Sequence, residues 1–218
     1  MPLPPPAASP APRRLPTRRG GEITAERILD AAEALFAERG YDGATLRDVA
    51  ARVGIRIPSL YNHFDGKDSL YAAVLDRGIR PVAELLGEFV QRGGPPDSPE
   101  LIRRVMAMLT RRPRLPRLVM HETVSGGQRL TPMLRNWIAP TFARSFEMVE
   151  ASGGDWKPEQ TKLVVLAMYH VVVGYFAIAP LYQQLSGEDL LSQQALEQQT
   201  RFLADFVEKL FPDRTHRP

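Results

Sequence analysis

Hydrophobic positions in the first third of the chain follow the spacing of helices that bury one face. Between Thr24 and Gly40 apolar side chains recur at intervals of three and four residues, which predicts an amphipathic helix. Thr24 is placed to cap its start, and Arg39 followed by Gly40 is a typical helix end. The predicted buried stripe consists of Ile28, Ala31, Ala32, Leu35 and Phe36.

A short helix is predicted to begin directly after Thr45. Thr45 and Asp48 have the spacing of a capping box, in which each residue satisfies a backbone amide of the other. Gly54 follows this helix and can adopt the positive φ that a tight turn requires. The side chains expected to face inward are Leu46, Val49, Ala50 and Val53.

A second short helix is predicted over 57–64, with Pro58 in its first turn and with Leu60 and Phe64 facing inward. Its other side chains suit the major groove of DNA. Arginine can bind guanine, asparagine can bind adenine, isoleucine can contact a thymine methyl, and tyrosine and histidine can donate to phosphates. The two short helices form a helix-turn-helix candidate. Its predicted outward residues are Arg56, Ile57, Ser59, Tyr61, Asn62 and His63.

The remainder of the chain also has a helical pattern, with almost no strand signal. Lys67 begins a helix that Pro81 kinks or divides, and the Gly-Gly-Pro-Pro run at 93–96 is the clearest internal break. Long helices are expected at about 158–182 and 188–211. The predicted fold class is therefore all-α, with an N-terminal three-helix domain over 22–68 and a helical bundle over 69–218.

Residues 1–21 are predicted to form a disordered arm rich in proline and arginine. Seven of the chain's 20 prolines lie within residues 1–16, a composition that favours extended conformers. The arm is either a solvated tail or a basic segment that supplements binding to a polyanion. Its basic residues are Arg13, Arg14, Arg18 and Arg19.

Composition narrows the function classes. Lys and Arg number 28 against 25 Asp and Glu, and this net charge of +3 permits a nucleic-acid partner without requiring one. The chain has no cysteine, which excludes disulfides, thiolate metal sites and cysteine nucleophiles and is compatible with a reducing cytoplasm. No apolar run follows Met1, so we expect no secretory signal and a cytoplasmic location.

The order and spacing of the N-terminal motifs carry a resemblance to a known family. Residues 24–71 closely resemble the DNA-binding domain of the TetR family of transcriptional regulators, about a quarter of the chain. The matching pieces are A-x-x-L-F-x-x-x-G-Y at 32–41, Thr45-Leu46, Val49-Ala50, Gly54-Ile55, Ser59-Leu60-Tyr61, His63-Phe64 and Lys67-Asp68.

The resemblance implies roles for individual residues. Thr45 matches a residue that caps the second helix and touches phosphate, and Ser59 matches a small residue of the recognition helix. Phosphate contacts are implied for Tyr61, His63 and Lys67. The chain departs from the common family pattern on the base-reading face, so the operator sequence does not follow by analogy. The departures are Arg56, Ile57, Pro58 and Asn62.

For the C-terminal half, the resemblance implies a divergent domain that dimerises and binds an apolar small-molecule effector. Two chains would present two recognition helices to a pseudo-palindromic double-stranded DNA operator, and the effector would release the repressor from it. Met and aromatic side chains at helical spacing are either ordinary core or pocket wall. The pocket candidates are Met106, Leu109, Leu118, His121, Glu122, Met133, Trp137, Met168, Tyr169, His170, Tyr175 and Phe176.

The sequence gives weaker support to two other function classes. An all-helical enzyme that binds a small molecule lacks support, because the chain has no nucleotide-binding or nucleophile-elbow motif; His121-Glu122 would need a histidine at position 125, which is Ser125. We expect no catalytic residue, metal or cofactor. A membrane-associated protein is suggested by 163–181, nineteen residues without a charged side chain. His170, Gly174 and Pro180 interrupt that stretch, so a buried or dimer-facing helix is favoured and no membrane partner is expected.

Overall fold

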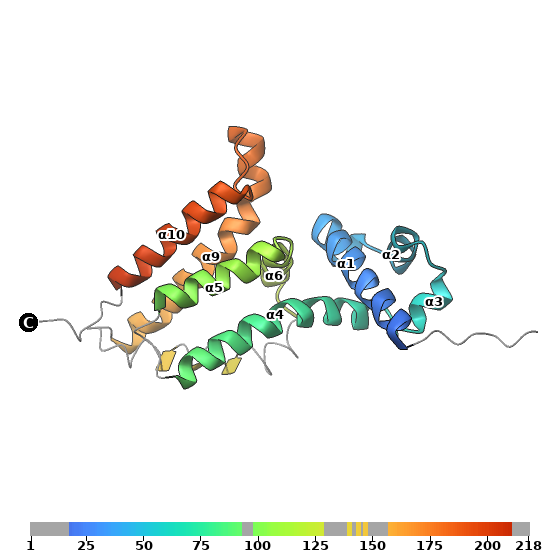
Figure 1. Cartoon of the computed structure of the whole chain (residues 1–218), viewed down its shortest axis with the longest axis horizontal. Coiled ribbons are helices and arrows are strands. Elements are labelled where there is room, and N and C mark those ends of the chain that lie inside the picture. The colour runs from blue at the N-terminus through green and yellow to red at the C-terminus, as the bar shows by residue number, and fades with distance from the viewer. Residues whose placement is uncertain are drawn as a thin grey trace, which may run out of the picture.

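The computed structural model describes residues 18–92, 98–128 and 157–210, with the pairs 139–140, 143–144 and 146–147 between them. Every element of these residues is a helix, which confirms the predicted all-α class. The long helix α4 joins an N-terminal group of three helices to a C-terminal group (Figure 1). The elements are α1 (Arg18–Gly43), α2 (Leu46–Val53), α3 (Ile57–Tyr61), α4 (Lys67–Gln91), α5 (Ser98–Arg111), α6 (Leu115–Val124), α9 (Pro158–Ser186) and α10 (Gln193–Leu210).

Helix α1 begins earlier than its sequence pattern predicts. The pattern places the start at Thr24, and residues 18–21 were assigned to the disordered arm, but the helix already begins at Arg18. Pro16 is the last proline before it, so no residue of α1 lacks a backbone donor. Residues 1–17 of the predicted arm lie outside the described residues. Gly40 breaks the helix with φ 72°, as its predicted role at a helix end requires.

The two short helices form with the predicted caps. Thr45 and Asp48 make a reciprocal capping box at the start of α2, and Gly54 ends that helix with φ 76°. Helix α3 ends at Tyr61 instead of the predicted residue 64. Here the chain tightens into a turn, in which the amide of His63 donates to the carbonyl of Leu60 at 2.9 Å.

One hydrophobic cluster holds the N-terminal helices together. It is built from residues of α1, α2, α3 and the start of α4, and Leu118 of α6 inserts into it. Leu60 is fully buried and is the one side chain of α3 in this core, while Leu46, Ile57 and Phe64 pack against its edge. The position of α3 therefore depends mainly on this one buried side chain.

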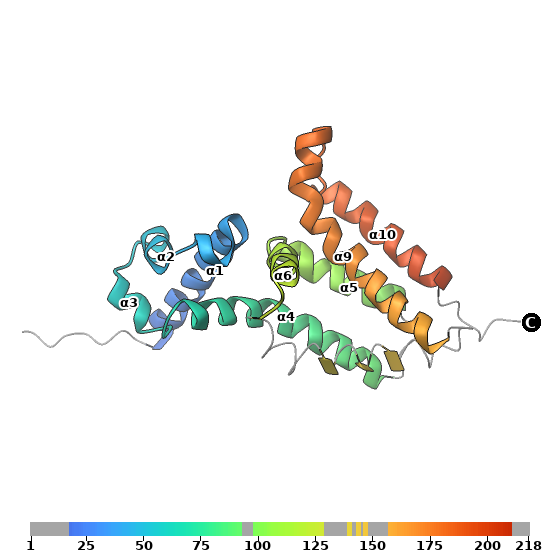
Figure 2. The same cartoon turned by 180° about the vertical axis from the view of Figure 1, so that it is seen from behind.

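A second cluster lies in the C-terminal half. Helix α10 packs along α5, and α9 packs on α6 (Figure 2). Side chains of α4, α5, α6, α9 and α10 meet around the fully buried Met106, Phe176 and Leu203. Helix α4 continues through Pro81 without being divided and supplies residues to both clusters. The predicted boundary after residue 68 thus falls at the start of a helix that both halves share.

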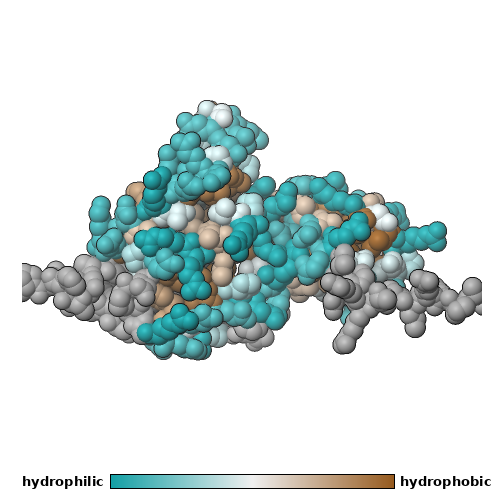
Figure 3. All heavy atoms as spheres, viewed as in Figure 1, coloured by the Kyte–Doolittle hydropathy of each residue, from teal (hydrophilic) through white to brown (hydrophobic). Residues whose placement is uncertain are grey.

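Helix α9 is longer and more exposed than a core helix. It extends to Ser186, where Gly187 ends it with φ 78°, and α10 begins at Gln193 rather than near 188. Hydrophobic areas interrupt the hydrophilic surface of the C-terminal helices (Figure 3). One segment, 162–186, is long and apolar enough to cross a membrane by length and composition alone. The large apolar side chains exposed on α9 are Leu163, Leu166, Val171, Ile178, Leu181, Tyr182 and Leu185.

Candidate nucleic-acid interface

Three contacts hold the turn between α2 and α3 in place. The guanidinium of Arg27 in α1 donates to the carbonyl of Val53 at 3.0 Å and so satisfies the C-terminal end of α2. The amide of Ile55 donates to the carbonyl of Ala50 at 3.0 Å across the glycine turn. Leu60 then fastens α3 to the core. Sequence reasoning missed Arg27, whose role depends on the packing of α1 against α2.

The polar face of α3 lies on the outside of this unit. Arg56, Tyr61 and Asn62 are exposed, and Ser59 and His63 are half-buried. Ile57 differs from its prediction as an outward residue, because it is half-buried and packs against the N-terminal core. An exposed arginine and amide beside a tyrosine hydroxyl can bond both base edges and phosphates.

Thr45 occupies the start of α2 with its hydroxyl already in use. The hydroxyl donates to the carboxylate of Asp48 at 2.7 Å and accepts from the amide of Asp48 at 3.1 Å. The bond from the Thr45 hydroxyl, and after it the bond that the Thr45 amide donates to the same carboxylate at 3.1 Å, lower the pKa of the Asp48 carboxyl. Asp48 therefore stays ionised and keeps α2 capped at neutral pH.

Lys67 lies at the first position of α4, near Tyr41. Its ammonium sits 4.2 Å from the centre of the Tyr41 ring and 3.5 Å from the carbonyl of Asp42. The hydroxyl of Tyr41 donates to the carboxylate of Asp68. The aromatic ring thus positions a cation at the end of the α2–α3 unit, a role for Tyr41 that sequence reasoning did not assign.

The described effector-pocket candidates do not converge on one place. Met106, Leu109 and Phe176 are buried in the C-terminal cluster, and Met168 and Tyr175 pack at its edge. The remaining candidates lie elsewhere, and Met133 and Trp137 are outside the described residues.

The other candidates lie where α6 meets its neighbours. Leu118 belongs to the N-terminal cluster. Glu122 is buried and accepts a hydrogen bond from the hydroxyl of Tyr71 at 2.9 Å, which ties α6 to α4. The exposed His121 lies beside Gly40. Tyr169 hydrogen-bonds Thr123 at 3.1 Å, and the ring of the exposed His170 bonds the carbonyl of Leu166. Within the described ranges, no three His, Asp or Glu side chains group in a way that could hold a metal ion.

Comparison with known sequences gives a family match in the N-terminal helices. Residues 28–74 match the family described as bacterial regulatory proteins, tetR family. The biofilm operon negative transcriptional regulator IcaR of Staphylococcus aureus (strain Newman) is 54% identical over 46 residues, which is 21% of this chain and 25% of IcaR. IcaR of Staphylococcus epidermidis is 48% identical over the same length. The chain thus matches about a quarter of the length of these curated relatives.

Solved structures extend the similarity to the whole fold. A bacterial regulatory protein of the tetR family from Rhodococcus RHA1 has a TM-score of 0.63 at 19% identity, with 86% of this chain and 96% of that chain covered. A transcriptional regulator from Aquifex aeolicus VF5 has a TM-score of 0.59 at 18% identity, with 86% and 99% covered. At these identities the similarity establishes the fold.

Proposed function

We propose that this chain, whose residues 28–74 match the bacterial regulatory proteins of the tetR family, is a cytoplasmic, homodimeric transcriptional regulator that binds a double-stranded DNA operator. The observation that carries the proposal is the α2–α3 unit, held rigidly on α1 with Arg56, Tyr61 and Asn62 exposed. We assign DNA binding to residues 22–68 and dimerisation with effector binding to 69–218. Residues 1–21 remain assigned as an arm, apart from the turn of α1 they contain.

Within the proposed interface, the residues divide into two kinds of contact. Arg56 and Asn62 are assigned to base edges in the major groove, with Ile57 and Ser59 close to them. Contacts to phosphates come from another set, which fixes the register of the protein on the duplex. That set is Thr45, Tyr61, His63 and Lys67.

A second copy of the chain is the partner we assign to the apolar face of α9. The exposed residues Leu163, Leu166, Ile178 and Leu181 recur at helical spacing, so they form a stripe along the helix. Phe202 and Phe206 on α10 are stacked and also exposed. A two-fold pair of such faces buries this surface and matches the symmetry of a pseudo-palindromic operator, without a membrane.

Repression is the proposed direction of regulation. It is supported by IcaR, a negative transcriptional regulator that shares the N-terminal helices. Release requires an effector that binds the DNA-free conformation more tightly than the DNA-bound one. To shift the operator from nearly full to nearly empty occupancy, its binding free energies for the two conformations must differ by about 5.5 kcal/mol. An apolar small molecule would suit the candidates that gather in the C-terminal cluster, and we propose that its pocket lies there, beside Met106, Leu109, Met168, Tyr175 and Phe176. We propose no catalytic role.

Selection of bound sites from random duplex DNA tests the proposal. We expect a pseudo-palindromic site with two half-sites about one helical turn apart. Compounds are then screened for release of the protein from that site. A purified protein that prefers no duplex over a scrambled competitor contradicts DNA recognition, whereas binding without release by any compound contradicts the effector alone.

Variants separate base reading from phosphate contact. Arg56→Ala should change the selected sequence and cost about 1–3 kcal/mol on the original site. Lys67→Ala should weaken binding to all duplexes and reduce the salt slope by about 1. Arg104→Ala, which removes an exposed arginine of α5, is the control and should change neither property. An unchanged preference in Arg56→Ala would mean that the base-reading face lies elsewhere.

A further inference from the structure

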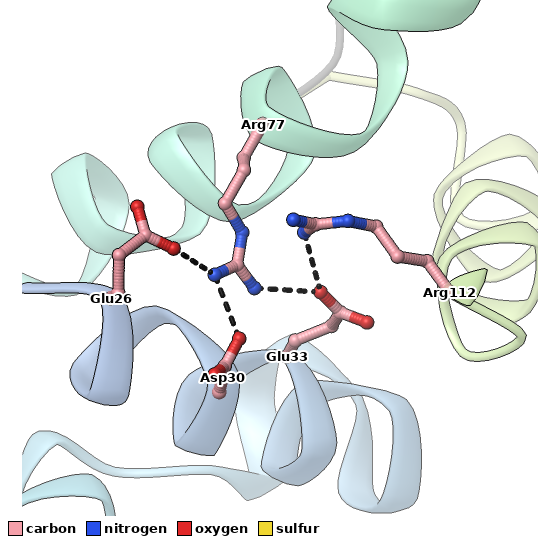
Figure 4. Close-up of polar contacts among 5 residues, drawn as sticks. All are labelled: Glu26, Asp30, Glu33, Arg77 and Arg112. Atoms are coloured by element: carbon pink, nitrogen blue, oxygen red, sulfur yellow. Dashed lines mark hydrogen bonds and ion pairs between the residues drawn. The ribbon is translucent and has the colours of Figure 1, made fainter. Parts of the chain in front are cut away.

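Arg77 of α4 binds three carboxylates of α1 at once (Figure 4). One terminal nitrogen of its guanidinium lies 2.9 Å from Glu26 and 2.8 Å from Asp30, and the other lies 2.9 Å from Glu33. The three acidic residues are spaced i, i+4 and i+7, so they share one face of α1. A single arginine therefore fixes almost two turns of α1 against α4.

Arg112 reaches the same cluster from a third segment. It lies between α5 and α6, and its guanidinium is 3.4 Å from the carboxylate of Glu33. Glu33 thus joins arginines separated by 35 positions in sequence, one from α4 and one from the α5–α6 turn. Figure 4 shows the two arginines approaching Glu33 from opposite sides.

The contact between Arg77 and Glu33 is largely shielded from water. The side chains of Arg77 and Glu33 are 12% and 10% exposed, unlike the surface pairs elsewhere in the described chain. Burial opposes the charge of Arg77, yet its hydrogen bonds to Glu26, Asp30 and Glu33 raise its pKa. The Nε atom of Arg77 is buried without a hydrogen-bond partner, so the group is oriented by its two terminal nitrogens alone.

Such clusters fix geometry more than they add stability. The desolvation of partly buried charges offsets most of their attraction, but a changed arrangement leaves a charge without its partner. Forked guanidinium–carboxylate bonds also restrict direction as well as distance. The cluster therefore restricts the angle between α1 and α4.

Close packing beside the cluster restricts the same joint independently. A Cβ added to Gly78 would lie 2.4 Å from the side chain of Leu115 at the start of α6. Helices α4 and α6 thus touch directly at the residue that follows Arg77. The ionic contacts join α1, α4 and the α5–α6 turn, and the apolar contact joins α4 to the first residue of α6, directly after that turn.

We propose that Arg77 and Arg112 are positioning residues for DNA recognition: through Glu33 they hold α1, and with it the α2–α3 unit, at a fixed angle to the C-terminal half. This inference rests on the proposed function. In a dimer, that angle sets the distance and rotation between the two α3 helices. One base pair displaces a half-site by roughly 3.4 Å and roughly 35°, so a loosened joint should broaden the accepted half-site spacing.

The first test compares the full-length Arg77→Gln variant with wild type. It measures their binding to a single half-site, to the selected full site, and to full sites whose half-site spacing is one base pair longer or shorter. We expect wild type to prefer the selected spacing by ~10-fold or more and the variant by less than ~3-fold. Affinity for the single half-site should stay within about twofold, because no DNA-facing residue is changed. Arg80→Gln is the matched control: this arginine is also in α4, but its partner Asp76 is in the same helix.

The second test needs no DNA. The chain has no native cysteine, so spin labels at Ala51→Cys in α2 and Ala107→Cys in α5 report one distance within the chain when diluted with unlabelled protein. Arg77→Gln should broaden the distribution of this distance about twofold, and Arg80→Gln should leave it unchanged. Arg112→Gln, whose side chain is 35% exposed, should broaden it less and supplies both readouts if Arg77→Gln does not fold.

These results distinguish the inference from the proposed function. A wild type that prefers no duplex overturns the proposed function and the spacing role with it. A wild type that prefers one spacing, together with folded variants that keep this preference and the narrow distance, overturns the positioning role alone. Equal losses on the half-site and the full site would also overturn it, since they indicate damage to the α2–α3 unit itself.

Discussion

Thr45 and Asp48 exchange three hydrogen bonds at the start of α2, and one of the partners is a carboxylate. The pKa of Asp48 is lowered in the folded state, so this stabilisation is fully present above the ordinary Asp pKa of 3.8 and is lost as pH falls through the lowered value. A local cap thus makes the α2–α3 unit, which we propose binds DNA, sensitive to acid.

Thr45→Val should remove the hydroxyl from this cap while keeping the shape of the side chain. We expect the free energy of unfolding to fall by about 1 kcal/mol at neutral pH, measured by urea denaturation. The difference from wild type should shrink as pH falls from the ordinary Asp pKa of 3.8 through the lowered pKa of the folded chain, below which Asp48 is protonated in both states. Thr45→Ser retains the hydroxyl and should behave as wild type; a pH-independent difference would contradict a role for the Asp48 charge.

Individual residues of the interface were predictable where local backbone chemistry decides their role. The cap at Thr45, the positive φ of Gly54 and the first-turn position of Pro58 all follow from the sequence and are confirmed. The bond from Arg77 to α1 was not predictable, because Glu26 and Arg77 are 51 positions apart and meet only once the helices pack. In the sequence, this acidic stripe has the pattern of a solvated face.

At the level of elements, α3 is a short helix held by one fully buried side chain. Leu60→Ala should destabilise the chain by about 2–5 kcal/mol, because it removes the core contact of α3 and leaves a cavity. DNA binding should be lost at temperatures where α4–α10 are still folded. Thermal denaturation, together with binding to the selected site, checks this; retention of full affinity would show that the turn alone holds α3.

The contact between α4 and α6 provides a second prediction. Gly78→Ala should cost about 1–3 kcal/mol, since its Cβ would lie 2.4 Å from the buried side chain of Leu115. The double variant with Leu115→Ala removes the clashing atoms, so its loss should be less than the sum of the single losses. Urea denaturation of all three variants gives the coupling energy, and simple additivity would contradict the clash.

Element boundaries were predicted less well than element identity. The pattern identified the helices but started α1 at Thr24 instead of Arg18 and extended α3 beyond Tyr61. Apolar spacing carries the helix signal, and residues 18–23 contain one apolar residue, Ile23, so the sequence has no such pattern there. The spacing also does not show which buried residues lie together. Met106 and Leu118 are both buried, but in different clusters.

For the whole molecule, the apolar stripe of α9 makes the assembly testable. Leu181→Glu places a charge on a side chain that is 54% exposed in one chain and that we assign to the dimer face. We expect a folded monomer in sedimentation experiments that loses the full site but keeps the half-site. Gln183→Glu adds the same charge to the opposite side of α9 and should remain dimeric. A dimeric Leu181→Glu would place the interface elsewhere.

The two hydrophobic clusters have a consequence for divergence among relatives. The N-terminal cluster is formed by residues up to Ile79, and Leu118 is the one later residue of the described chain that enters it. Substitutions in α9 and α10, whose described residues do not enter this cluster, can therefore accumulate with little effect on how the first helices pack. This partition accounts for a match of 54% that stops after 46 residues, while full-length structural neighbours keep their architecture at 18–19%. The N-terminal and C-terminal halves of the chain can therefore diverge at different rates.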